Sequence, residues 1–95
     1  MSTSIALNNQ NIAFPVLHMN GNDPETLAHQ YFNASLALEK FVEKFCEIEF
    51  HARDYYVAEP ATWEKAVRQR EEIKFKIQDI RQYLELHAAH CFEAS

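Results

Sequence analysis

Two long runs of residues repeat in alternating steps of three and four, and this spacing strongly limits the fold. The first run consists of Leu27, Tyr31, Ala34, Leu38, Phe41, Phe45 and Ile48. The second consists of Trp63, Ala66, Arg70, Ile73, Ile77, Ile80, Leu84, His87 and Cys91. Such steps keep side chains on one face of an α-helix. Because the 95 residues include only one glycine and three prolines, long helices meet few interruptions. The sequence predicts an all-α protein.

The ends of both helices carry recognisable signals. Asp23 can cap the first helix, Pro24 suits its first position, and Glu25 complements its positive end. This helix is predicted to span about 24–51, and the second, with Pro60 in its first turn, about 60–92. The connection between them is as long as antiparallel neighbours usually need. We expect one long antiparallel two-helix hairpin, residues 14–95, after a flexible N-terminal tail, residues 1–13.

Folding the chain back about residues 55–56 sets an approximate register between the helices. It places Ile48 near Trp63, Phe41 near Arg70, Ala34 near Ile77, and Leu27 near Leu84. His87 and Cys91 then extend beyond the first helix. The apolar segment 14–19, which Pro15 keeps extended, is the nearby chain that can cover them. We therefore expect an extended N-terminal arm along the end of the second helix.

A single hairpin has one shared seam and leaves other apolar side chains outside it. They are Phe32, Leu36, Cys46 and Phe50 on the first helix and Val67, Phe75 and Leu86 on the second. Of these, Phe32, Leu36 and Phe75 are our candidates for contact with a partner. Exposed apolar patches of several hundred Å² usually mark an interface, and two-fold dimers are the commonest oligomers. The sequence thus favours a homodimer in which two hairpins form a four-helix bundle. The alternative is scattered surface apolar groups, which are normal.

Charge and composition exclude several classes of protein. The formal charge is −5, and basic residues alternate with Glu, so we expect no nucleic-acid binding. This mixture of signs also disfavours an acidic mimic of DNA. No apolar run reaches the roughly 18–20 residues that span a bilayer, and the first residues lack the pattern of a signal peptide. Two cysteines suggest no disulfide framework. We expect a cytoplasmic protein without membrane contact.

The connection contains the most distinctive short motif, Arg53-Asp54-Tyr55-Tyr56. Tyrosine and arginine are enriched at binding hot spots, so this loop could contact a partner protein. The alternative is that one tyrosine closes the end of the seam while Arg53 and Asp54 satisfy backbone groups at the helix termini.

Near the C-terminus, His87, His90 and Cys91 form the most ligand-like cluster, and His18 on the arm could approach them. His87 and Cys91 are four residues apart, a spacing that can bind one metal ion. A structural zinc site needs four ligands, however, and no other Cys or His has motif spacing. Packing at a helix end, where histidine complements the dipole, is the alternative.

Arg70 is a charged residue at a seam position. Its stem can pack while its guanidinium reaches solvent or meets a Glu of the first helix or of a second chain. A polar seam residue of this kind can fix the register or the oligomeric state.

Nothing in the sequence points to catalysis. The serines lie in no nucleophile motif, and the chain contains neither a glycine-rich phosphate loop nor an H-E-x-x-H motif. We expect no enzyme activity and no cofactor.

The segment Leu17-His-Met-Asn-Gly-Asn22, which leads into a long helix, and the later Arg53-Asp-Tyr-Tyr56 resemble features of small uncharacterised helical proteins encoded by bacteriophages and prophages. The resemblance implies a cytosolic protein of an infected or lysogenic bacterium and brings no activity. We expect a non-enzymatic, dimeric protein–protein interaction protein. The alternative is a small metal- or ligand-binding helical protein centred on the His/Cys cluster.

Overall fold

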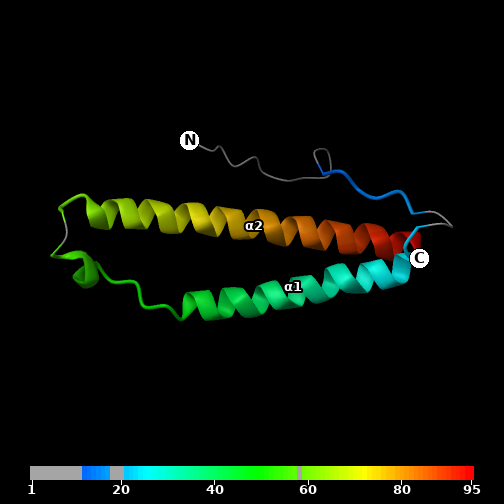
Figure 1. Cartoon of the computed structure of the whole chain (residues 1–95), viewed down its shortest axis with the longest axis horizontal. Helices are drawn as coiled ribbons and strands as arrows, with labels where there is room; N and C mark the ends of the chain where they lie inside the picture. Colours follow the sequence, from blue (N-terminus) through cyan, green and yellow to red (C-terminus); the bar gives the residue numbers. More distant parts are fainter. Residues whose placement is uncertain (1–11, 18–20, 58) are drawn as a thin grey trace.

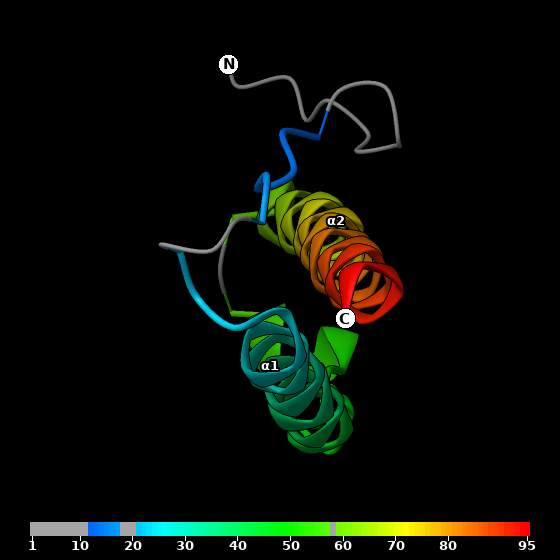
Figure 2. The ribbon, with the colours of Figure 1, turned by 90° about the vertical axis from the view of Figure 1, so that its right-hand side faces the viewer.

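The computed structural model describes residues 12–17, 21–57 and 59–95. Its elements are helix α1 (Pro24–Cys46), a short 3₁₀ helix η1 (Ala52–Tyr55) and helix α2 (Thr62–Ala94). The two long helices run antiparallel, with the start of α1 beside the end of α2 (Figure 1). Viewed along their axes, they form a single layer (Figure 2). The prediction of an all-α antiparallel hairpin is confirmed.

The start of α1 follows the signals in the sequence. The Asp23 carboxylate accepts hydrogen bonds from the Thr26 backbone N–H (3.0 Å) and the Thr26 hydroxyl (2.9 Å). Pro24 occupies the first turn, and Glu25 lies at the positive end of the helix.

The prediction that the first helix continues to His51 is wrong, because α1 ends at Cys46. The Glu47 and Ile48 N–H groups turn back to the carbonyls of Lys44 and Phe45, three residues earlier. Beyond this turn, Phe50 leaves the helical path and packs on Trp63, with ring centroids 4.8 Å apart. This contact with α2 outweighs the helical pattern of the last residues. Ile48, which was predicted in the seam, is consequently exposed.

The register also differs from the prediction. Tyr31 packs on His87, with centroids 4.7 Å apart, and Glu39 pairs with Arg81 at 2.7 Å. These positions of α1 therefore lie opposite residues about two turns later in α2 than predicted. The cause is the early end of α1, because the chain after Cys46 is not helical and covers more length per residue than α2 does. His87 thus lies against α1 rather than beyond it, which corrects the prediction.

The arm lies where the sequence placed it. Phe14 packs against the rings of His87 and His90, with centroids 5.0 and 4.7 Å away. The arm follows the C-terminal part of α2 (Figure 1). His18 and Met19 lie outside the described residues, as do residues 1–11 of the predicted tail, whereas Ile12 is buried.

The core is small and lies mostly at one end of the hairpin. The buried residues among those described are Ile12, Ala28, Ile77, His87, Ala88 and Cys91. Small side chains such as Ala28 and Ala88 allow close approach of the helices at this end. Towards the connection, the helix ribbons diverge (Figure 1). In the described part of the chain, neither helix has a stretch that is long and apolar enough to cross a membrane.

Candidate functional site

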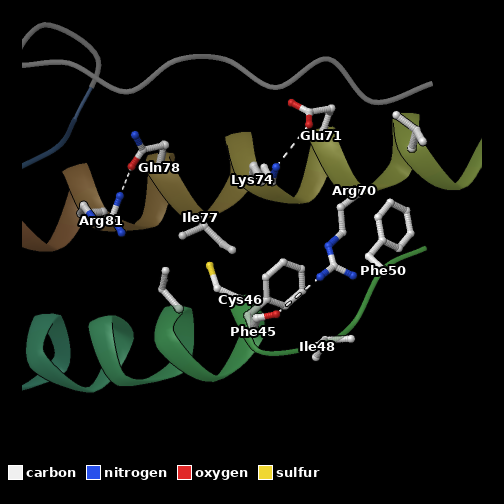
Figure 3. Close-up of a pocket in the computed structure, with 12 residues that line it drawn as sticks. Phe45, Cys46, Ile48, Phe50, Arg70, Glu71, Lys74, Ile77, Gln78 and Arg81 are labelled. Atoms are coloured by element: carbon white, nitrogen blue, oxygen red, sulfur yellow. Dashed lines mark hydrogen bonds and ion pairs between the residues drawn. The ribbon is translucent and has the colours of Figure 1, made fainter. Parts of the chain in front are cut away.

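An open groove lies between α1 and α2 at the end near the connection, and its volume is about 590 Å³. Its apolar lining comes from both helices and from the segment after α1: Val42, Phe45, Ile48, Phe50, Val67 and Ile77. Four charged residues of α2 complete it: Arg70, Glu71, Lys74 and Arg81. Figure 3 shows these side chains around the space between the two ribbons. The groove combines apolar walls with charged groups, as ligand-binding sites commonly do.

Arg70 lies at the centre of this groove. The carbon at the centre of its guanidinium lies 4.2 Å from the Phe45 ring centroid and 4.7 Å from that of Phe50. One terminal nitrogen donates a hydrogen bond to the Phe45 carbonyl at 3.4 Å. Figure 3 shows the guanidinium between the two rings. Arg70 thus meets the negative end of the α1 dipole and two aromatic faces, instead of a Glu of the first helix.

The other charged groups at the groove are held in pairs. The Arg81 Nε and a terminal nitrogen donate to the Glu39 carboxylate at 2.7 and 3.1 Å, and a second terminal nitrogen donates to Gln78. This hydrogen bonding lowers the pKa of Glu39 and raises that of Arg81. Lys74 pairs with Glu71 at 3.3 Å. Among the described residues, by contrast, no carboxylate lies within ion-pair distance of Arg70.

The two tyrosines of the connection have different surroundings. Tyr55 in η1 packs on Phe50 and Trp63, with centroids 6.0 and 5.4 Å apart. It therefore closes the end of the hairpin, as one of the two sequence interpretations held. Tyr56 is exposed, and so are its neighbours Arg53 and Asp54. Only Tyr56 of the pair offers an aromatic ring to a partner.

The three predicted surface apolar residues do not form one patch. Phe32 and Leu36 are exposed on α1. Neither residue lines the groove. Phe75 is exposed on α2 two residues before the buried Ile77, so it points away from α1.

The histidines near the C-terminus hold the arm. His87 is 1% exposed, and its Nδ1 donates to the Tyr83 carbonyl at 2.9 Å. His90 Nε2 donates to the Pro15 carbonyl at 2.9 Å, and its ring stacks on Phe14. The seam spacing found both His87 and Tyr31, but their contact was missed because the register was wrong. Tyr83, whose ring also packs on His87, lies four residues earlier on α2 and was not predicted.

Cys91 is fully buried beside this cluster, and burial raises the pKa of its thiol. His18, the fourth residue of the predicted cluster, lies outside the described residues. Across residues 12–17, 21–57 and 59–95, no three His, Cys, Asp or Glu side chains are grouped so that they could hold a metal ion.

Comparison with known proteins adds no assignment. No protein-family model matches the chain, and no curated protein or solved structure gives a significant match. The function is therefore argued from the residues themselves.

The contacts of Arg70 predict the effect of removing its charge. Replacing Arg70 by Met keeps the apolar stem but removes both ring contacts and the hydrogen bond to Phe45. We expect a loss of about 1–3 kcal/mol in the free energy of unfolding, measured by urea denaturation. Arg70→Lys should restore part of this loss, because an ammonium keeps the charge but not the planar contact. The exposed Arg68→Met is the matched control, and equal losses for Arg68→Met and Arg70→Met would contradict this role.

The buried thiol predicts a loss of stability in alkali. Burial raises the pKa of Cys91, and burial together with the neighbouring Tyr83 raises that of Tyr31. The unfolded chain therefore ionises first, from about pH 8.5 for a thiol, and the free energy of unfolding should fall as the pH rises further. Cys91→Ala should make this fall shallower between about pH 8 and pH 10. The exposed Cys46→Ala should keep the wild-type slope, and an unchanged slope in Cys91→Ala would contradict the role of the buried thiol.

Proposed function

We propose that this chain is a non-enzymatic interaction protein that binds a helical segment of another protein in the groove between α1 and α2. The observation that carries the proposal is an open apolar groove with the Arg70 guanidinium at its centre. An amphipathic helix laid in an apolar groove is a recurrent mode of protein recognition. The volume of the groove also lies within the range of sites that bury most of a ligand.

The charges of the groove indicate what kind of helix it would bind. Three cations and one carboxylate line it, although the whole chain has a formal charge of −5. Lys74 forms an ion pair with Glu71, and Arg81 forms one with Glu39. Among the described residues, no carboxylate pairs with Arg70 in the same way. Its guanidinium has five N–H donors and gives one to Phe45. The partner segment is therefore one with apolar side chains on one face and an Asp or Glu directed at Arg70.

Apolar side chains outside the groove are also open to a partner. Tyr56 and Val57 are exposed at the connection end, and Phe32 and Leu36 are exposed on α1. Aromatic side chains around a buried anchor are typical of interface centres. Together they give a partner more contact area than the groove alone.

The biological setting is part of the same proposal. The sequence motifs Leu17–Asn22 and Arg53–Tyr56, which resemble those of phage and prophage proteins, support a role as an accessory protein of a phage or prophage. In that setting the protein would act in the cytoplasm, on a protein of the phage or of its host.

Capture from a lysate of a lysogenic bacterium tests the groove. Ile48→Glu adds a negative charge to the groove wall at an exposed position outside the helices, so it should abolish the binding of an acidic apolar segment. Phe75→Glu, the same kind of change at an exposed site outside the groove, is the matched control. We expect the wild type and Phe75→Glu to recover the same protein and Ile48→Glu to lose it, with recovery measured by quantitative mass spectrometry.

Cys46 gives an independent readout on purified protein. It is exposed and lines the groove, whereas Cys91 is buried. A partner seated in the groove should slow the reaction of Cys46 with a maleimide. Equal recovery by all three proteins, or unchanged Cys46 labelling in the presence of the recovered partner, would contradict the proposal.

A further inference from the structure

The side of the hairpin opposite the groove carries apolar side chains along its middle, and no other described segment covers them. On α2, the buried Ile77 faces α1. Lys74, three residues before Ile77, and Arg81, four residues after it, line the groove. Ile73, four residues before Ile77, and Ile80, three residues after it, turn to the other side. They are 39% and 48% exposed.

Helix α1 contributes to the same side. Val42, four residues after the half-buried Leu38, lines the groove, so Phe41, three residues after Leu38, lies on the opposite side. Phe41 is 51% exposed. We call the surface formed by Phe41, Ile73 and Ile80 the isoleucine face. All three residues belong to the repeat that predicted the helices, yet the opposing helix does not cover them.

The chain covers one end of this side itself. His87 follows Ile80 by seven residues, close to two helical turns, so it lies on the same side of α2 as Ile80. Phe14 packs on His87 and on His90, and Pro15 accepts a hydrogen bond from His90. The arm thus continues the isoleucine face as a covered surface. What remains uncovered is the middle of the hairpin.

We propose that a second copy of this chain covers the isoleucine face, so that two hairpins stack as an antiparallel four-helix bundle. Two copies of the chain offer each other the same apolar side chains, so this occupant needs no surface beyond the one described.

The layout of the face also suits a two-fold axis, which requires a self-complementary patch. Along α1, Phe41 lies between Glu39, which contacts Arg81, and Phe45, which contacts Arg70. Phe41 is therefore at the same height along the hairpin as the midpoint between Ile73 and Ile80 on α2. An axis through this midpoint, perpendicular to the helices, sets Ile73 opposite the partner's Ile80 and Phe41 opposite the partner's Phe41. Ile73 and Ile80 are seven residues apart, and each would pack against the other residue of the partner's pair, as residues of a heptad repeat do in a helical bundle.

Two lysines on opposite sides of α2 allow a matched cross-linking test. Lys76 lies between Ile73 and Ile80 on the helix surface, whereas Lys74 lines the groove. Each is replaced by Cys in a chain that carries Cys46→Ser, with the buried Cys91 unchanged. In the proposed dimer, residue 76 lies close to the partner's residue 76 across the axis, and a short bis-maleimide should join them.

We expect covalent dimers from Lys76→Cys and at most a few per cent of that yield from Lys74→Cys. Adding Ile80→Glu to Lys76→Cys should remove the product, because a charge would be buried in the interface. Dimers from Lys74→Cys alone, equal yields from both variants, or no product from either would overturn the proposal. The groove lies on the other side of the hairpin, so its binding experiments can succeed or fail independently of this result.

Discussion

The two helices can cover each other on only one side, and this constraint shapes the rest of the molecule. A hairpin is a single layer, whereas stable domains pack at least two layers around a core. Close contact is confined to the end where Ala28 and Ala88 are buried and where Cys91 and His87 fill the remaining space. The arm adds Phe14 and Ile12 at that end, which forms a second layer over a few residues of α2. Elsewhere the apolar positions of the repeat are only half covered.

Arg70 determines how the other end of the hairpin is built. Its guanidinium contacts the rings of Phe45 and Phe50 and donates a hydrogen bond to the Phe45 carbonyl near the end of α1. One charged group of α2 thus contacts both the end of α1 and the segment that follows it. An arginine at a seam position cannot be packed as tightly as an aliphatic residue, because its N–H groups need acceptors or water. The helices are therefore held apart where Arg70 enters, and the groove is the space that results. The same residue that stabilises the end of α1 gives that groove its positive charge.

The sequence contained enough local information to predict the helices but too little to predict their alignment. The three–four repeat and the Asp23-Pro24 cap predicted α1 and α2, and Pro15 predicted the extended arm, because each depends on neighbouring residues. The end of α1 depends on Phe50 meeting Trp63, a contact between distant positions that no local pattern shows. That error moved the reversal point, so the register, the aromatic surroundings of His87 and the partners of Arg70 were missed. At the candidate site, Arg70 was recognised as unusual, whereas the groove required the true end of α1. Arg53–Tyr56 was recognised too, but the sequence could not separate the packed Tyr55 from the exposed Tyr56.

The proposal that a second copy of the chain covers the isoleucine face is tested most directly by the mass of the protein in solution. Size-exclusion chromatography with multi-angle light scattering over about a hundredfold range of concentration gives that mass without a variant or a label. The account predicts twice the 11.1 kDa of the chain at high concentration, with a fall towards the monomer mass only on dilution. A mass of 11.1 kDa at every concentration would contradict it and would mean that the isoleucine face is not an interface between copies of this chain.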